Sequence, residues 1–475
     1  MSKNENILAE LGSRLSSGAS IVLPNNTEFA NLTSRWREYD APSINVVVEV
    51  ANESDVQQTV LYAAKHGIPF FARSGGHGAT GALIQARNAI QIDFRSLNHI
   101  ALSEDGQIAT IGGGANVADT VNKFASLGKR TVTGICECVG FSAPALGGGH
   151  GWLQGQYGLM ADQVTSARLV LSNGEAVTVS EKSNKDLFWA IRGAGHNFGL
   201  VTEWEYHVYD DNPSWSYETF VYTGDKLEAL YNLANKTMRD QPPELVHWGY
   251  IIKYAKPYHD IGPLSVQTGQ GTLHDLAVLT FQVSSTIWSN MAVLGIRTSI
   301  ENVKSILTPW HQDKNGPGCA YGLTSRHYPI VLQTYNVTAV REVYNEIDST
   351  FNKVPEVADY FFLLKGYSTQ AVKAIDPDST AFPHRDDNIL VTSYIQYKPN
   401  STIDPLAQEF GEKIRKYLLV GSEDPEYLRA YVNYADGTES LHEFYGWEAW
   451  RIEKLKKLKA QWDPQNKMRY YVPIE

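Results

Sequence analysis

Two glycine-rich segments, about sixty residues apart, constrain this chain more than any other feature. The first reads Arg73-Ser74-Gly75-Gly76-His77 and follows a short apolar run, and the second reads Gly134-Ile135-Cys136. Because glycine adopts positive φ and lets the backbone approach a ligand closely, both segments are predicted to be turns. Each turn carries a nucleophile, since histidine is uncharged over much of the physiological pH range and cysteine needs only a modest fall in pKa to form thiolate.

These two nucleophiles match the chemistry of a flavin. The 8α-methyl of an oxidised isoalloxazine becomes an electrophile after losing a proton, and an imidazole adds there, while carbon 6 of the same ring accepts a thiolate. The pair therefore predicts a flavin attached to the chain twice, through His77 and a cysteine of the second turn. The alternative is structural, because most histidines satisfy internal hydrogen bonds and most buried cysteines only pack.

Length and charge set further limits. With 475 residues the chain is too long for one ordinary core, so we expect two domains. A net charge of −11 argues against a nucleic-acid partner, and the lack of Lys/Arg-rich runs argues against an anionic membrane. No apolar run reaches transmembrane length, the N-terminus lacks the apolar core of a signal peptide, and an odd number of cysteines fits a reducing compartment. We therefore expect an intracellular protein without a disulfide framework.

The first half of the chain alternates between strand and helix patterns, which indicates an α+β domain. One helix is expected to start at a cap on Asn52 or Ser54 and to end at Gly67. A short helix near 186–191 precedes a glycine-rich segment, 193–199. The other expected elements are a helix over 117–127 and strands at 44–50, 69–72, 89–93, 107–111 and 200–206.

The segment 211–430 has a different character. Aromatic-rich stretches in which apolar and polar residues alternate predict an antiparallel sheet with one face covered. Helical patterns separate these stretches, and another helical pattern ends before Asp463-Pro464. The stretches are 248–252, 277–283 and 391–397, and the helical patterns are 227–238, 340–350 and 447–458.

Four blocks of sequence resemble the berberine bridge enzyme-like family of FAD-linked oxidases, within the vanillyl-alcohol oxidase (PCMH-type) FAD-binding superfamily. The resemblance implies an α+β fold with a PCMH-type FAD-binding domain in two parts, 1–208 and a returning C-terminal segment, 431–475. Residues 209–430 would form a substrate-binding domain with an antiparallel sheet covered by helices. The blocks are 71–77, 134–140 continuing to 147–151, 187–199, and 431–434 together with 462–466.

The resemblance also implies which residues bind FAD. It selects Cys136, three residues before Val139, for the thioether and leaves Cys138 to packing, whereas the residues alone do not decide between the two. Segment 193–199 is a weak dinucleotide-binding pattern, because no strand directly precedes it, so its amides are instead expected to line the pyrophosphate and adenosine. No metal ligand is expected. The expected FAD-binding residues are Arg73, Ser74, Gly75, Gly76, His77, Gly78, Cys136, Val139, Gly140, Gly147, Gly148, Gly149, Gly151, Gly193, Gly195, Asn197, Gly199 and Val201.

Four residues are candidates for catalysis. Gly134 lies where the family gates oxygen, and glycine there leaves the flavin open to O2. Tyr434 matches a C-terminal tyrosine that serves as base in the family's carbohydrate oxidases, and it needs a neighbouring charge to lower its pKa from about 10. Asp359 or Gln396 is expected to support it. One departure is Pro144, which stands in place of a family histidine and offers no hydrogen-bond donor.

Together these features predict an FAD-dependent oxidase. It would transfer a hydride to flavin N5 from a C–H next to oxygen or nitrogen in a small organic substrate, such as a secondary-metabolite intermediate, and ring closure could follow. O2 would reoxidise the flavin and give H2O2. Three alternatives stay open: an oligosaccharide oxidase that forms a lactone, a cyclase or lyase with structural FAD, and a non-catalytic flavin-binding protein.

Overall fold

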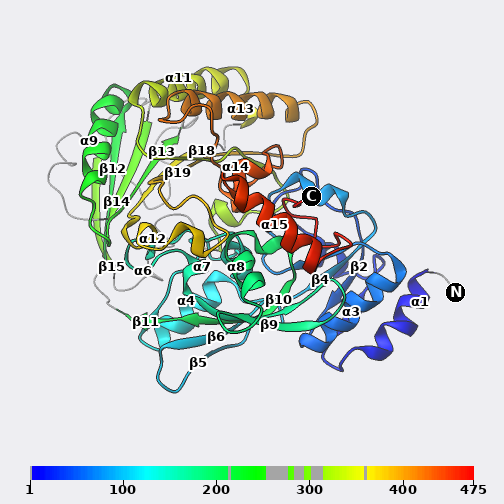
Figure 1. Cartoon of the computed structure of the whole chain (residues 1–475). Coiled ribbons are helices and arrows are strands. Elements are labelled where there is room, and N and C mark those ends of the chain that lie inside the picture. Colours follow the sequence, from blue (N-terminus) through cyan, green and yellow to red (C-terminus); the bar gives the residue numbers. More distant parts are fainter. Residues whose placement is uncertain (1–2, 212–214, 253–275, 283–293, 301–313, 358–360) are drawn as a thin grey trace.

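The computed structural model describes residues 3–211, 215–252, 276–282, 294–300, 314–357 and 361–475. Within these residues, sheets of four, five and eight strands organise the chain, and a two-stranded pair is formed by β7 (Lys129–Arg130) and β11 (Tyr209–Asp210) (Figure 1). The four- and five-stranded sheets and their helices, all before residue 208, lie together at one end of the molecule. The large sheet, from residues 215–397, lies at the other end, and the C-terminal helices return between the two ends.

The first sheet positions the first glycine-rich turn. Its helix α3 (Glu53–His66) is capped by Asn52, whose side chain accepts the Asp55 amide hydrogen, and ends at Gly67 with φ of 62°, which confirms the expected boundaries. The parallel neighbours β4 and β3 are buried except for Ala72, and β3 ends directly at the turn. In spatial order the strands are β1 (Ser20–Val22), β2 (Ile44–Glu49), β4 (Ala89–Asp93) and β3 (Phe70–Arg73).

The second sheet is antiparallel and carries the second turn beside it. Helix α4 (Val117–Ser126), predicted over 117–127, follows strand β6 of this sheet, and α8 (Lys185–Ala194) packs against the C-terminal helix α15 (Ala449–Trp462). The core under these helices contains side chains from the first half and from the last fifty residues of the chain alike. The strands, in spatial order, are β5 (Ile100–Leu102), β6 (Ile108–Gly112), β10 (Leu200–His207), β8 (Val164–Val170) and β9 (Ala176–Ser180).

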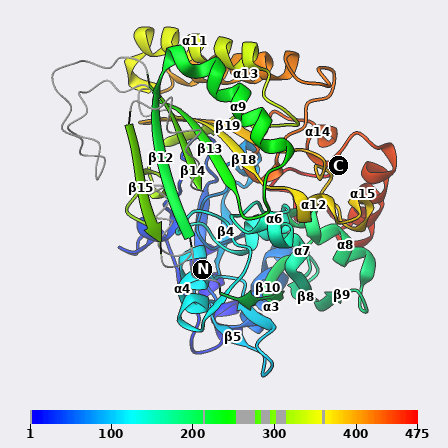
Figure 2. The same cartoon turned by 90° about the vertical axis from the view of Figure 1, so that its left-hand side faces the viewer.

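The large sheet is antiparallel and is covered on one face by helices (Figure 2), which confirms the predicted architecture. The covering helices bury Leu230, Val343 and Ile414 against the sheet. They are α9 (Leu227–Arg239), α11 (Val337–Lys353) and α13 (Asp404–Val420). The strands are β15 (Leu294–Ile300), β12 (Trp215–Thr223), β14 (Leu276–Gln282), β13 (Val246–Ile252), β18 (Phe361–Tyr367), β19 (Ile389–Tyr397) and β16 (Thr324–His327), and β17 (Ile330–Leu332) also pairs with β19.

The proposed domain boundaries fall between elements. The second sheet ends with β10, and the large sheet begins with β12, on either side of residue 208. After α13 the chain leaves the large sheet and forms α14 (Leu441–Tyr445) and α15. Across the described ranges, no helix combines the length and the apolar character that a membrane span requires.

Candidate functional site

A cavity of about 290 Å³ lies where the two glycine-rich turns face the large sheet and the C-terminal segment. Turn residues Ser74–Gly78 and Gly134–Cys136 form one wall. Side chains from the large sheet and from the segment after α13 form the opposite wall. Those side chains are His327, Tyr394, Tyr431, Asn433 and Tyr434.

The two turns pack backbone against backbone. A Cβ built on Gly75 would lie 2.5 Å from the Cys138 carbonyl oxygen and 2.6 Å from the Gly140 nitrogen, so only glycine fits there. Gly76 has φ of 69°, a conformation that L side chains rarely adopt. The predicted meeting of the two segments is therefore what the structure shows.

His77 has the properties of a neutral nucleophile. Its Nδ1 lies 2.9 Å from the Gly75 carbonyl oxygen, and the ring lines the cavity. Burial lowers the pKa of His77 to about 4, so the imidazole is uncharged at physiological pH. An uncharged imidazole is the form that adds to an electrophilic carbon.

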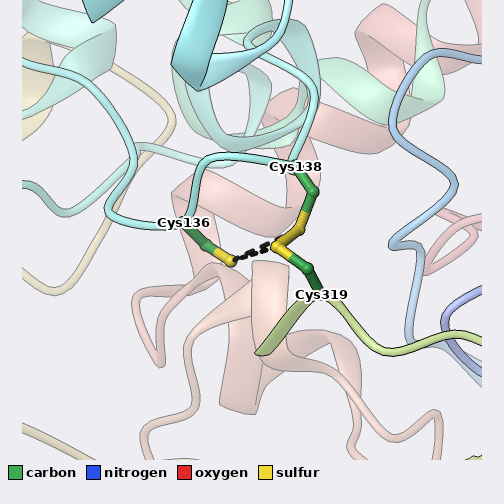
Figure 3. A group of neighbouring side chains, drawn as sticks. All are labelled: Cys136, Cys138 and Cys319. Atoms are coloured by element: carbon green, nitrogen blue, oxygen red, sulfur yellow. Dashed lines mark hydrogen bonds between the residues drawn. A yellow bond between two sulfur atoms is a disulfide. The ribbon is translucent and has the colours of Figure 1, made fainter. Parts of the chain in front are cut away.

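The cysteines correct one expectation. Cys138 forms a disulfide with Cys319, although the two are 181 residues apart, because the turn η7 (Pro317–Cys319) folds onto the second glycine-rich turn (Figure 3). The expectation of no disulfide is wrong, and so is the assignment of Cys138 to simple packing. Sequence separation was a poor guide, since folding brings the two Cα atoms to 5.9 Å. Cys136 lies outside the disulfide, is buried and lines the cavity.

Two arginines make the same wall suitable for an anion. Arg73 is buried, its Nη1 lies 3.5 Å from Asp93 Oδ2, and its Nη2 donates to the Ser34 carbonyl. Arg35 is 5% exposed, and neither its Nε nor its Nη1 has a hydrogen-bond partner among the described residues. Burial and the nearby Arg73 lower the pKa of Arg35 to about 10, so it keeps its charge. Orphaned cationic donors beside glycine-rich backbone fit the pyrophosphate of FAD.

The structure divides the expected FAD-binding residues of the later segments into two groups. Gly199 and Val201 line the cavity, whereas a second group is absent from its lining. Asn197 is buried and donates to the Val472 carbonyl, and its own side-chain oxygen accepts the Ile474 amide hydrogen, so it anchors the C-terminus. A Cβ on Gly193 would lie 2.2 Å from the Phe382 nitrogen. The residues outside the cavity wall are Gly147, Gly148, Gly149, Gly151, Gly193, Gly195 and Asn197.

A tyrosine of the opposite wall contacts a lysine that is absent from the cavity lining, and sequence reasoning did not connect the two. Tyr434 lines the cavity as expected, and its hydroxyl oxygen lies 2.5 Å from Lys365 Nζ. Lys365 points inward from β18, is fully buried and also lies 4.8 Å from the Trp248 ring. Burial lowers the pKa of Lys365 to about 7 and raises that of Tyr434 well above its ordinary value. At neutral pH the pair is therefore a phenol beside an amine that is neutral in about half of the molecules.

The residue that contacts the Tyr434 hydroxyl, Lys365, is neither of the two expected there. The side-chain amide of Gln396 donates to Ser325 Oγ at 3.0 Å, and Gln396 is absent from the cavity wall. Asp359 lies outside the described residues. Nor does a neighbouring charge lower the pKa of Tyr434, because burial and three further tyrosines raise it. A sequence signal for Lys365 did exist: it is the single charged residue of the strand Phe361–Tyr367.

His327 is a further residue that sequence reasoning missed. It lies on β16 opposite Tyr394 of β19, and both side chains line the cavity. Within the described chain, neither ring nitrogen of His327 has a hydrogen-bond partner. Burial lowers the pKa of His327 to about 3, so a neutral imidazole faces the cavity beside the Trp36 ring, 5.1 Å away. Such a group can orient a polar atom of a bound molecule.

Gly134 lies on the cavity wall as the gate hypothesis requires. A Cβ built on it would meet Val117 at 3.4 Å and Pro144 at 3.8 Å, which are ordinary contacts. The structure thus leaves room for a small side chain at position 134. Pro144 accepts a hydrogen bond from the Asn433 side chain through its carbonyl oxygen, so it still joins the two walls.

Comparisons with known proteins identify the family of this chain. The chain matches the model of an FAD binding domain over residues 44–180 and that of "Berberine and berberine like" over residues 430–475. It is 36% identical to the FAD-linked oxidoreductase chyH of Penicillium rubens, with 98% of this chain and 93% of that protein covered. It is also 36% identical to the FAD-linked oxidoreductase anuG of Penicillium roqueforti, with 98% and 91% covered.

Solved structures share the fold. Wild-type BBE-like 1 of Physcomitrella patens matches with a TM-score of 0.83 at 19% identity, and 99% of each chain is covered. A xylooligosaccharide oxidase from Myceliophthora thermophila matches with a TM-score of 0.80 at 20% identity, again over 99% of each chain. The predicted α+β, PCMH-type architecture is thereby confirmed. The chain belongs to the berberine bridge enzyme-like family of FAD-linked oxidoreductases.

Proposed function

We propose that this protein is an oxidase with FAD attached through both His77 and Cys136, acting on a small organic substrate at a C–H next to oxygen or nitrogen. The observation that carries the proposal is the pairing of two nucleophiles on one cavity wall. His77 is a neutral imidazole, Cys136 is a buried cysteine outside the disulfide, and their turns pack directly on each other. Tyr434 on the opposite wall, with Lys365 behind it, would supply the proton acceptor that oxidation of an alcohol or amine requires.

Residues of the first wall would hold the rest of the cofactor. The turn Ser74–Gly78 presents backbone amides, and Arg35 and Arg73 bring two positive charges to the same wall. Bound there, FAD accepts a hydride at N5 and passes the electrons to O2, which gives H2O2. Gly134 leaves space at this wall for O2 to reach the cofactor.

Tyr434 and Lys365 would remove the substrate proton together. A phenol with a raised pKa is a poor base alone, yet its hydroxyl lies 2.5 Å from an amine that is about half neutral at pH 7. As the substrate O–H or N–H proton moves to Tyr434, the phenol proton moves to Lys365. The proton thus ends on the amine, and the lone pair left on the substrate promotes loss of the hydride from carbon.

The aromatic cavity wall favours a small organic substrate, for which we propose a secondary-metabolite intermediate. Trp36, His327 and Tyr394 form a cluster with ring centroids 4.3 to 6.2 Å apart, and His327 offers a polar contact. The same aromatic faces could stack against sugar rings, so oxidation of an oligosaccharide to a lactone is the second candidate. Ring closure would follow oxidation where the substrate carries an internal nucleophile.

Anaerobic mixing with a panel of alcohols, amines and glycosides tests the function. We expect one substrate class to bleach the yellow flavin absorbance, and air to restore it with stoichiometric H2O2. Bleaching by glycosides alone would select the second candidate. Product formation without bleaching would contradict the proposal and indicate a cyclase or lyase with structural FAD.

A further inference from the structure

Three sulfur atoms meet beside His77, and a disulfide occupies two of them (Figure 3). Cys136 Sγ lies 3.5 Å from Cys138 Sγ and 3.6 Å from Cys319 Sγ. Cys136 and Cys138 belong to one turn of the FAD-binding region, whereas Cys319 comes from the segment that follows β15. The disulfide therefore determines which cysteine of the turn keeps its thiol.

Cys138 occupies the position of a competing nucleophile. Its Sγ lies 3.3 Å from His77 Nε2, the side chain that would hold the same flavin ring. If Cys138 were reduced, its thiol would lie 3.3 Å from His77 Nε2 and 3.5 Å from the sulfur of Cys136. Two thiols would then lie beside the proposed attachment site. A sulfur in a disulfide has no thiolate form and cannot add to carbon.

We propose that Cys319 directs flavin attachment to Cys136 by holding the competing sulfur of Cys138 in a disulfide. The inference rests on the proposed bicovalent flavin and makes Cys319 a positioning residue for it. In the attachment step the S–H bond of Cys136 and the C6–H bond break and one S–C6 bond forms. O2 takes up the two electrons and two protons as H2O2, and the disulfide is unchanged.

Cys136 is badly placed to exchange with the disulfide. Its sulfur is almost equidistant from the two bonded sulfurs, at 3.5 and 3.6 Å, so it faces the bond from the side. Thiol–disulfide exchange requires a thiolate to approach one sulfur along the axis of the bond, with the other sulfur leaving. The arrangement thus keeps Cys136 as the thiol of the cluster.

Other contacts hold the Cys319 turn in place without its sulfur. The Lys314 amide donates to the Glu137 carboxylate at 2.8 Å, and the Tyr321 hydroxyl donates to the Gly75 carbonyl. Both contacts join the same turn to the two glycine-rich segments. Replacing Cys319 with serine should therefore remove the disulfide while the backbone stays in position, which makes the substitution a clean test.

Peptide mapping of the denatured holoenzyme tests the proposal. Endoproteinase Glu-C cuts after Glu137 and so separates Cys136 from Cys138, and mass spectrometry then locates the flavin on each peptide. The wild type, Cys319→Ser and Cys138→Ser/Cys319→Ser are compared, with unreduced samples mapped for the disulfide. Wild-type protein should show the Cys138–Cys319 cross-link and flavin on His77 and Cys136.

The Cys319→Ser variant should lose at least half of the flavin attached at Cys136. Either flavin should appear on Cys138 instead, or Cys136 and Cys138 should form a disulfide with each other. Cys138→Ser/Cys319→Ser should restore attachment at Cys136, because the competing thiol is gone. Unchanged attachment in Cys319→Ser, no restoration in the double variant, or no cross-link in the wild type would overturn the inference. A wild type without flavin on Cys136 would instead refute the bicovalent proposal itself, so the two failures are distinguishable.

Discussion

The two walls of the cavity are built in different ways. The wall that would hold FAD consists of backbone turns, and its chemistry depends on local sequence: a histidine on one glycine-rich turn and a cysteine on another. The opposite wall consists of side chains that reach the cavity from β16, β19 and the segment after α13, and Lys365 of β18 lies behind it against Tyr434. Its chemistry depends on which strands lie next to one another.

This difference separates cofactor binding from substrate chemistry. The backbone wall tolerates little change, because at Gly75 an added Cβ would overlap the facing backbone. The side-chain wall can exchange residues without disturbing any turn. Relatives that share the first wall can therefore differ in the second, and predictions about the two walls should fail or hold independently.

The largest effect is expected from Lys365→Met, which keeps the volume of the side chain but removes the proton acceptor. Stopped-flow anaerobic reduction of the flavin should slow by about 1,000-fold at pH 7, within the range of general-base contributions. In the wild type, the rate should rise with pH through about 7, because burial lowers the pKa of Lys365 to that value and only the unprotonated amine accepts the proton. In the variant this rise should move above pH 10.

Exposed Lys353→Met is the control and should leave both the rate and its pH profile unchanged. An unaltered pH profile in Lys365→Met would show that the lysine has only a structural role.

The second prediction concerns the anchor of the side-chain wall. Asp436, two residues after Tyr434, forms buried ion pairs with Arg37 and Arg326 at 2.7 Å each. Asp436→Asn leaves two buried guanidinium groups without their carboxylate and should lower the free energy of unfolding by about 3 kcal/mol in urea titrations. Lys185→Gln breaks an exposed pair and should change it by less than about 0.5 kcal/mol.

The stabilisation that Asp436 provides depends on pH in a defined direction. Burial raises the pKa of Asp436, but Arg37 and Arg326 lower it by more, so the net shift is downward. The stabilisation is therefore present above the ordinary carboxyl pKa of about 3.9 and is lost as the pH falls through the lower folded-state value. A difference between wild type and Asp436→Asn that grows at acidic pH would contradict this assignment.

Gly134→Val tests the backbone wall at the point where O2 would enter. Reoxidation of the reduced enzyme should slow roughly tenfold, an increase of about 1.4 kcal/mol in the barrier, while anaerobic reduction changes little. Double-mixing stopped-flow measures the two half-reactions separately. Equal slowing of both would mean that the valine disturbs the whole cavity and that Gly134 is only a turn residue.

The smallest effect is expected from Gln396→Leu. The side chain contacts Ser325 and does not line the cavity, so flavin reduction should change by less than about twofold. A decrease in the reduction rate as large as that of Lys365→Met would show that Gln396 supports Tyr434 in catalysis, as the sequence analysis expected.

The features that the sequence predicted belong mainly to the backbone wall, and those that it missed belong mainly to contacts between distant segments. The turns around Gly75 and Cys136, the cap at Asn52 and the antiparallel sheet were predictable, because each is a local pattern with a local physical cause. Lys365 was not, because its approach to Tyr434 depends on β18 pairing with β19 and on a C-terminal segment that folds back. The Cys138–Cys319 disulfide was missed for a similar reason, since nothing local joins two cysteines 181 residues apart.

Intact-mass analysis of the denatured protein shows whether FAD is covalently attached to the chain. We predict a wild-type mass greater than that of the polypeptide by one FAD, with the yellow colour in the acid precipitate. His77→Ala and Cys136→Ser should each retain one linkage, and the double variant should release all of its flavin on precipitation. A wild-type mass equal to that of the bare polypeptide, with the colour left in the supernatant, would contradict the account.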